Sequence, residues 1–233
     1  MRFYEPDISA TSVGSTYTLN PENSHHLSHV LRAKIEDEVT VFNGKSGEFK
    51  ATISTIDKKS VSLKVLSFST INRTRPRPVD LVFPLSANTK MSFIIQKATE
   101  LAVSNLYPIQ TEFGQKQLHS HNKQSRLRYQ KIIIAAAMQS GLNVLPCCHT
   151  PCQVQDLPWS IWAQSTKVVC HPSSQSTNSH DHPDRVIWFV GPEGGWSDAE
   201  ITFFEEKKCD FRILAPTLLR METACVAALS QQV

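Results

Sequence analysis

The sequence predicts an α/β fold, with a small β-domain first and a larger domain built on a mainly parallel sheet after it. Residues 1–72 carry short runs that alternate apolar and polar side chains between turn residues, which is typical of strands. After residue 78 the rhythm changes to strand, helix, strand, helix, which indicates a parallel sheet with helices on both faces. A segment rich in proline and arginine, residues 73–78, separates the two patterns.

The N-terminal domain, expected over residues 1–72, should contain one helix and several strands. Asn20 is a suitable N-cap, and Pro21 fits the first helical position, where no backbone donor is needed. The alternating runs indicate a meander or a small barrel. Strands are expected at residues 39–42, 49–53 and 61–65.

The second domain is expected over residues 79–233, after a linker at residues 73–78 whose two prolines favour extended backbone. The polar stretch 171–184 is interpreted as a surface loop. Strands are expected at residues 81–83, 106–109, 167–170, 186–190 and 211–214, and helices at 89–103, 125–140, 197–207 and 221–231.

Composition excludes several classes of protein. Of the 233 residues, 40% are hydrophobic and 19% are charged, as in ordinary globular proteins. No run of eighteen apolar residues exists and the first residues lack the order of a signal peptide, so we expect no membrane association and a cytoplasmic location. The six cysteines are expected to be reduced thiols. Cys147, Cys148, His149 and Cys152 lack a second, well-spaced ligand pair, so no metal site is expected.

Positive charge is concentrated in the middle third of the chain. Residues 73–145 contain 10 Lys and Arg against 3 Asp and Glu, a net charge of +7. Residues 1–72 contain 8 positive and 8 negative side chains, so their charges balance. Residues 146–233 contain 6 positive and 10 negative side chains, a net charge of −4. An ordinary solvated surface would also be basic in places, but so local a concentration favours a polyanionic partner, RNA or DNA.

The first segment that suggests chemistry follows a buried strand at residues 186–190. Its sequence is Gly191-Pro192-Glu193-Gly194-Gly195, and the Ser197 and Glu200 that follow have the spacing of a capping box. A strand, a glycine-rich loop and a helix N-terminus form the place where open α/β sheets bind ligands. The loop lacks the dinucleotide and phosphate fingerprints, so alone it indicates a ligand loop or an ordinary tight turn.

The second segment leads from a strand ending near Leu214 into Leu219-Arg220-Met221-Glu222-Thr223-Ala224. Arg220 and Glu222 are surrounded by apolar residues, where charge is not needed for solubility. They can form an ion pair at a helix start, or they can serve a ligand. With the first loop, two strand ends then offer backbone and charge to one crevice.

These two segments resemble the SPOUT superfamily, knotted methyltransferases that use S-adenosylmethionine. More narrowly, the chain is similar to the bacterial family often called RsmE, which methylates N3 of a uridine in 16S ribosomal RNA of the small subunit. The resemblance covers nearly the whole chain. Further matching stretches are His25-His26-Leu27, Val30-Leu31-Arg32, Phe42-Asn43-Gly44, residues 96–101, Lys131-Ile132 and Gln139-Ser140-Gly141.

The resemblance implies a deep trefoil knot in the methyltransferase domain, a PUA-like β-barrel that binds RNA before it, and a homodimer with the active site near the subunit interface. Arg220 is the candidate for stabilising the uracil anion, and Glu222 for orienting Arg220 or accepting the proton. RNA contacts are expected from Arg32, Lys97, Arg126 and Arg128. S-adenosylmethionine is expected to contact Leu85, Val190, Gly191, Pro192, Glu193, Gly194, Gly195, Leu214, Ala215, Leu219, Arg220, Thr223 and Ala224.

The chain also departs from the family's pattern, and two other functions stay open. One is a knotted methyltransferase acting on another RNA nucleotide, and the other is an RNA-binding ribosome assembly factor that holds the cofactor without turnover. The lost arginines bear on RNA binding more than on the cofactor. Met138 and Leu142 stand where glutamate and arginine are expected, Ala215 and Thr217 where glycine and arginine are, Ala102 where glycine is, and Tyr129 where tryptophan is.

Overall fold

The computed structural model describes residues 1–114, 122–172 and 184–231. Contacts divide the chain into two compact units, of which the first comprises Met1–Arg73 and Ala137–Leu145 and the second comprises Thr74–Ala136 and Pro146–Val233. The sequence did not lead us to expect residues 137–145 in the first unit. The domain boundaries drawn from the sequence stay a prediction.

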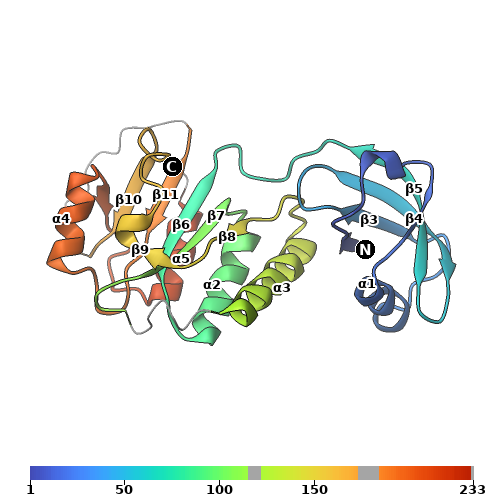
Figure 1. Cartoon of the computed structure of the whole chain (residues 1–233), viewed down its shortest axis with the longest axis horizontal. Helices are drawn as coiled ribbons and strands as arrows, with labels where there is room; N and C mark the ends of the chain where they lie inside the picture. Colours follow the sequence, from blue (N-terminus) through green and yellow to red (C-terminus); the bar gives the residue numbers. More distant parts are fainter. Residues whose placement is uncertain (115–121, 173–183, 232–233) are drawn as a thin grey trace. The chain divides into compact units, whose positions relative to one another are not determined.

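A five-stranded sheet forms the body of the first unit, with strand order β1-β3-β4-β5-β2 (Figure 1). β1 pairs with β3 in parallel, and the other pairings are antiparallel. The three strands expected from alternation are confirmed, whereas β1 and β2 were missed because three residues are too few to display a period. The strands are β1 (Arg2–Tyr4), β2 (Thr16–Thr18), β3 (Glu38–Phe42), β4 (Glu48–Ile56) and β5 (Val61–Ser69).

The helix of the first unit begins where its cap residues predict. Asn20 accepts a hydrogen bond from the Asn23 backbone N–H at 2.9 Å, and Pro21 opens α1 (Pro21–His25). The chain continues as one π-helical segment, η2 (His26–Val30), whose Leu27 is fully buried. A short 3-10 helix, η1 (Ala10–Ser12), precedes β2. Leu27 packs with alternate residues of β3, β4 and β5, which gives this unit its own core.

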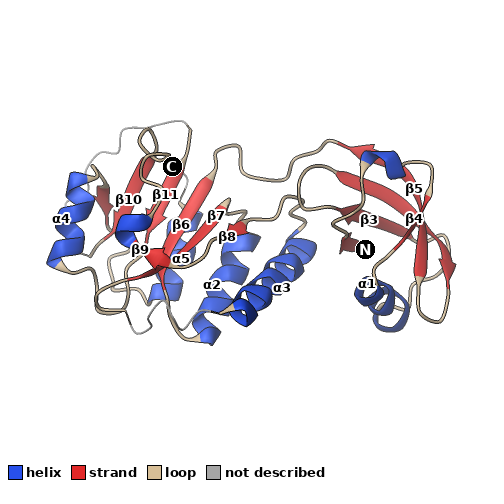
Figure 2. Ribbon diagram, viewed as in Figure 1, coloured by secondary structure: helices blue, strands red, loops and turns tan. Residues whose placement is uncertain are grey.

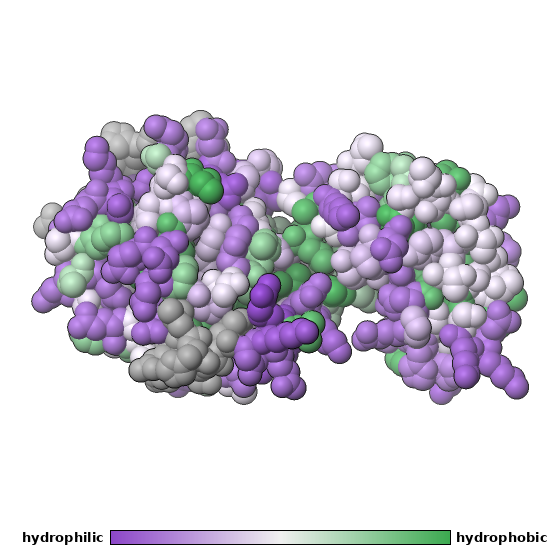
Figure 3. Space-filling model, viewed as in Figure 1, coloured by the Kyte–Doolittle hydropathy of each residue, from purple (hydrophilic) through white to green (hydrophobic). Residues whose placement is uncertain are grey.

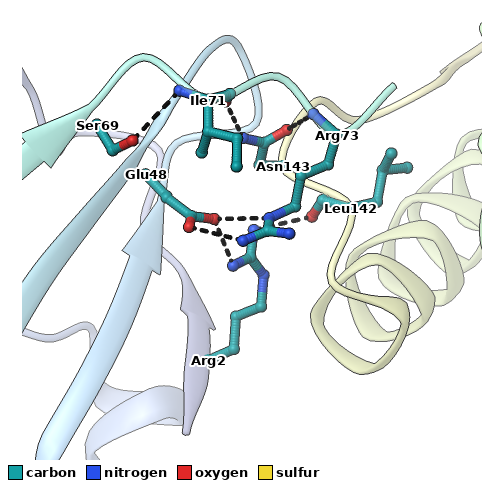
Figure 4. Close-up of polar contacts among 7 residues, drawn as sticks. All are labelled: Arg2, Glu48, Ser69, Ile71, Arg73, Leu142 and Asn143. Carbon is teal, nitrogen blue, oxygen red and sulfur yellow. Dashed lines mark hydrogen bonds and ion pairs between the residues drawn. The ribbon is translucent and has the colours of Figure 1, made fainter. Parts of the chain in front are cut away.

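A buried carboxylate ties distant parts of the first unit together (Figure 4). Glu48, at the start of β4, accepts hydrogen bonds from Arg2 Nη1 at 2.8 Å and from Arg73 Nε and Nη2 at 3.1 and 3.0 Å. Asn143 accepts from the Arg73 backbone N–H at 3.0 Å and donates to the Ile71 carbonyl at 2.7 Å. These contacts account for the presence of residues 137–145 in this unit.

The second unit is built on a seven-stranded sheet within the described residues (Figure 2). The strand order is β12-β10-β11-β6-β7-β8, β9 lies beside β7, and every pairing found is parallel. All residues of β6 and β11 are buried, so both faces of the sheet are covered. The predicted parallel α/β architecture is confirmed. The strands are β6 (Val79–Pro84), β7 (Asn105–Gln110), β8 (Cys147–Cys148), β9 (Cys152–Gln153), β10 (Thr166–Cys170), β11 (Val186–Phe189) and β12 (Asp210–Arg212).

The strand expected at residues 211–214 is wrong at its end, because β12 stops at Arg212. The next two residues, Ile213 and Leu214, leave the sheet and line a cavity. The helices lie close to their predicted positions, and α5 packs against α2 and β6. They are α2 (Asn88–Glu100), α3 (Lys123–Ser140), α4 (Asp198–Glu206) and α5 (Met221–Ser230), with a 3-10 turn, η4, at Val154–Asp156. The loop expected at residues 171–184 falls mostly on 173–183, outside the described residues.

α4 starts with the capping box that its sequence predicts. The Ser197 hydroxyl accepts from the Glu200 backbone N–H at 3.3 Å, and Glu200 Oε2 accepts from the Ser197 backbone N–H at 2.9 Å. The helix then packs Phe204 against Phe189 of β11 and against Trp196, with ring centroids 5.2 and 4.8 Å apart. This aromatic core fixes the place where the glycine-rich loop leaves the sheet.

Candidate active site

A cavity of about 630 Å³ lies at the carboxyl ends of β10, β11 and β12 in the second unit. Its lining comes from the end of β10 with His171 and Pro172, from residues 190–196, from residues 212–221 and from Ala224. The carboxyl ends of parallel strands are where open α/β sheets bind their ligands, and the volume suits a small molecule. The two segments singled out in the sequence therefore line one cavity.

The glycine-rich loop needs its glycines for two reasons. Gly195 has φ +78°, in the left-handed region that glycine adopts without strain, and its N–H donates to the Pro192 carbonyl at 2.9 Å. A Cβ on Gly191 would lie 3.0 Å from Trp196 Nε1. The same indole N–H donates to the Cys170 carbonyl at 3.3 Å, so Trp196 joins this loop to the end of β10.

The second segment runs along the cavity as an apolar strip and ends at a helix start. Arg220 is the N-cap residue of α5, and its carbonyl accepts from the Ala224 backbone N–H at 2.8 Å. Upstream, the Arg212 carbonyl accepts from the His171 backbone N–H at 3.1 Å, which holds this segment beside the end of β10.

Most of the residues expected to contact the cofactor lie on this cavity. The exceptions are Leu85, Thr223 and the catalytic candidate Glu222, which are not among its lining residues. Leu85 is buried just after β6, and its N–H donates to the Ile109 carbonyl at 2.8 Å. Those that line the cavity are Val190, Gly191, Pro192, Glu193, Gly194, Gly195, Leu214, Ala215, Leu219, Arg220 and Ala224.

Sequence reasoning missed a charged residue, Lys90, which the structure places beside both segments. Its ammonium forms an ion pair with Glu193 and lies 4.0 Å from Glu222 Oε2. The hydrogen bond from Lys90 lowers the pKa of Glu193 and raises the pKa of Lys90 itself, so this pair is charged at neutral pH. Over the ranges that the structure describes, no ion pair joins Arg220 to Glu222. The signal available in the sequence was a lysine near a helix start, where cations are unfavourable.

Burial disfavours the reactive form of the two cysteines near the cavity, Cys170 and Cys225. Burial raises the pKa of the Cys170 thiol to about 12 and raises that of Cys225 well above its usual value. Both thiols are therefore protonated at neutral pH, whereas the thiolate is the reactive form. The charged or ionisable side chains that line the cavity besides Cys170 are His171, Glu193, Arg212 and Arg220. Lys90 contacts Glu193 and lies near Glu222, just outside the lining.

The histidine of the cluster that suggested zinc packs against an aromatic side chain. The His149 ring stacks on Tyr107 with centroids 4.1 Å apart, and its Nε2 lies 3.0 Å from Asn105 Oδ1. Within the described part of the chain, no group of three or more potential metal ligands is found.

The four RNA-binding candidates differ in how free their charges are. In the first unit Arg32 is exposed. In the second unit, Lys97 is paired with Glu100 at 2.8 Å, and Arg128 donates to Asn88 Oδ1 at 2.9 Å. Arg126 is exposed on α3, in the basic middle third of the sequence. Figure 3 shows hydrophilic side chains in many groups on the drawn face, with hydrophobic ones scattered between them.

The first unit has a smaller hollow, of about 270 Å³, that sequence reasoning did not find. His25 and His29 stack on each other there with ring centroids 4.5 Å apart. Lys58 and Lys59, from the turn between β4 and β5, line the same hollow together with Pro21 and Ser28.

Comparisons with known families and proteins agree with this geometry. A family model described as RNA methyltransferase domain matches residues 73–232, and one described as RNA methyltransferase PUA domain matches residues 19–66. Among the described residues, no helix is long and apolar enough to span a membrane.

Individual relatives match over almost the whole chain. The ribosomal RNA small subunit methyltransferase E of Buchnera aphidicola is 32% identical over 92% of this chain and 86% of its own length, and that of Bacillus subtilis is 28% identical over 92% and 88%. A crystal structure of the protein of this name from Neisseria gonorrhoeae, bound to S-adenosylmethionine, superposes with a TM-score of 0.84 at 27% identity. It covers 98% of this chain and 94% of its own.

Proposed function

We propose a function from one premise: this chain belongs to the ribosomal RNA small subunit methyltransferase E family of RNA methyltransferases. On that premise it transfers a methyl group from S-adenosylmethionine to a base of small-subunit ribosomal RNA. The observation that carries the proposal is the cavity at the strand ends, which both the glycine-rich loop and the segment before α5 line.

The cavity fits S-adenosylmethionine by its size, its backbone and its lining. Its volume of about 630 Å³ is within the range of small-molecule sites. The missing side chain of Gly191 lets the loop backbone pack directly against Trp196. The mostly apolar segment from Ile213 to Leu219 offers a surface for a purine ring. We assign the holding of the cofactor to the main chain of residues 190–195 and 214–224. When bound, the cofactor supplies a methyl group already activated on a sulfonium.

We propose N3 of a uridine as the methyl acceptor, and two side chains as the groups that activate it. Uracil N3 carries a proton, and its loss leaves negative charge on O2 and O4. Arg220, exposed at the cavity rim, would stabilise that charge. Glu222 Oε2 is buried and has no hydrogen-bond partner among the described residues, which suits a group that accepts the proton directly or through water. Burial raises the pKa of the Cys170 thiol to about 12, which disfavours a covalent route through it.

Arg220→Ala tests the first of these roles. The rate of methyl transfer at saturating cofactor should fall by about 10²-fold or more, because the charge developing on the base loses its cation. Cofactor affinity, measured by calorimetry, should stay within about threefold of wild type, because we assign cofactor binding mainly to backbone groups. Arg220→Lys should recover part of the rate. Full turnover by Arg220→Ala would remove Arg220 from the mechanism.

We further propose the finer architecture that family membership implies. The N-terminal domain, residues 1–72, would close as a PUA-like barrel, and the methyltransferase domain, residues 79–233, would contain a trefoil knot. After the edge strand β12 the chain returns to the middle of the sheet, where α5 packs on β6, and this supports a threaded C-terminal end.

Leu218, 83% exposed beside the cavity, supports a homodimer with the site near its interface, which light scattering would test. Such an enzyme would act in the bacterial cytoplasm.

One experiment separates the proposed function from its alternatives. The protein is incubated with isotope-labelled S-adenosylmethionine and small ribosomal subunits that lack the modification, and the methyl group is mapped by mass spectrometry. A methyl group on N3 of a uridine supports the proposal. A methyl group on another nucleotide identifies a divergent methyltransferase, and no incorporation with intact cofactor binding favours an assembly factor.

A further inference from the structure

A lysine at position 90 does not stabilise the helix in which it lies. It lies in the first turn of α2, where the helix dipole makes a cation unfavourable. The turn contains no acidic residue, and the N-cap residue Ala87 makes no side-chain hydrogen bond to it. A lysine that breaks a local rule in this way requires a reason outside the helix.

The first reason is Glu193 of the glycine-rich loop. Its carboxylate accepts a hydrogen bond from the Lys90 ammonium, and the two side chains are 37% and 32% exposed. An exposed pair of this kind adds little to stability by itself. It does, however, connect a loop that lines the cavity to the start of α2, whose Met91, Ile94 and Ile95 are buried in the second unit.

The second reason is Glu222, in the first turn of α5. Its Oε2 is buried without a hydrogen-bond partner among the residues described, and the nearest cationic group to it is the same ammonium, 4.0 Å away. A buried carboxylate oxygen without a donor is costly unless a charge lies close by. Lys90 thus faces one carboxylate from each of the two segments that frame the cavity.

We propose that Lys90 is a positioning residue, whose ammonium joins Glu193 to Glu222 and so holds the glycine-rich loop and the start of α5 in a fixed relation. We call these three side chains the ionic clasp. The clasp keeps the cavity in shape and holds Glu222 Oε2 in place beside it, from where it can accept the proton of the target base directly or through water. This catalytic consequence rests on the proposed function, whereas the structural consequence does not.

The test combines a structural readout with a kinetic one. Lys90→Met removes the ammonium from both carboxylates, and Glu193→Gln removes the charge of the carboxylate in the glycine-rich loop. The double variant combines the two changes, and Lys90→Arg conserves the positive charge. Lys207→Met is the control, because it removes an ammonium at the end of α4 without touching the cavity lining. Backbone hydrogen exchange of residues 193–196 and 222–225 is measured without RNA, and single-turnover methylation is measured at saturating cofactor.

The clasp predicts that Lys90→Met makes both segments exchange about tenfold faster and lowers the transfer rate about tenfold or more, since small misplacements near a reacting group are costly. The double variant should be no worse than Lys90→Met, because both changes break the same contact. Lys90→Arg and Lys207→Met should stay near wild type. Unchanged exchange in Lys90→Met, or effects that add in the double variant, would overturn the clasp. An inactive wild type with the expected exchange changes would overturn the proposed function and leave the clasp standing.

Discussion

At the scale of single residues, Glu48 links three separate parts of the first unit through its hydrogen bonds to Arg2 and Arg73. The residue is 8% exposed, and its carboxylate accepts three hydrogen bonds from two guanidinium groups that are 46 and 25 residues away in the chain. The hydrogen bond from Arg73 is the largest cause that lowers the pKa of Glu48 below its usual value. The charged form is therefore the one that the folded unit prefers, and folding of this unit depends on pH.

We predict that Glu48→Gln lowers the free energy of unfolding of the first unit by about 2 kcal/mol at neutral pH, because charge-assisted hydrogen bonds are lost. A carboxyl group with a lowered folded-state pKa contributes stability that is present above its unfolded value, 4.5, and is lost as the pH falls through the folded value. The difference between wild type and variant should therefore shrink below pH 4.5.

Hydrogen exchange of the β4 amides at several pH values measures this effect. Glu38→Gln, an exposed carboxylate on β3, is the control and should leave stability within about 0.5 kcal/mol of wild type. A difference between Glu48→Gln and wild type that persists unchanged at acid pH would contradict the assignment of the effect to this carboxylate.

At the scale of elements, the end of α2 departs from what its backbone favours. Ala102 follows the C-cap residue Leu101 and has φ +54°, in the left-handed region that glycine usually occupies after a helix. The resemblance to the family had led us to expect a glycine at this position. Alanine at this position therefore lowers the stability of the fold, because an L-residue in this region is strained by about 1 kcal/mol.

We predict that Ala102→Gly raises the free energy of unfolding by up to about 1 kcal/mol, since relief of the strain exceeds the entropy that glycine adds to the unfolded chain. Ala135→Gly, the same substitution in the exposed interior of α3, should lower it by about 1 kcal/mol. Denaturant titration of both variants measures the pair. If both substitutions destabilise equally, the strain at Ala102 is not real.

Elements with a strong local signal could be predicted from the sequence. Asn20 and Pro21 marked the start of α1, and the spacing of Ser197 and Glu200 marked the start of α4. The two segments that line the cavity were also identifiable, because glycines after a buried strand and charges in an apolar setting are local features. Leu214 was misplaced in a strand, since apolar residues that line a cavity look like those of a strand.

Contacts between residues far apart in the chain could not be predicted. Lys90 is separated by more than a hundred residues from both Glu193 and Glu222, and no local pattern connects them. Met138 and Leu142, which depart from the family's pattern, have a packing role that only the structure reveals. Met138 packs against the core of the first unit, and Leu142 is 4% exposed.

At the scale of the whole molecule, the distribution of charge bears on the RNA substrate that we propose. The sequence concentrates a net charge of +7, from 10 positive and 3 negative side chains, in residues 73–145. Several of those charges are already engaged within the protein, as Lys97 is with Glu100 and Arg128 is with Asn88. RNA phosphate groups are therefore expected to contact the exposed basic side chains of this segment, of which Arg126 is the clearest example.

We predict that this protein binds small-subunit ribosomal RNA with an affinity that falls steeply between about 50 and 200 mM salt, because each neutralised phosphate releases counterions. Arg126→Ala should make the slope of log K against log salt shallower by about 0.7 to 0.9, which corresponds to one phosphate contact. Filter binding over a salt series measures both slopes. Lys207→Ala, outside the basic third, should leave the slope unchanged. If Arg126→Ala weakens binding to one RNA sequence but keeps the wild-type slope, Arg126 reads a base and not the backbone.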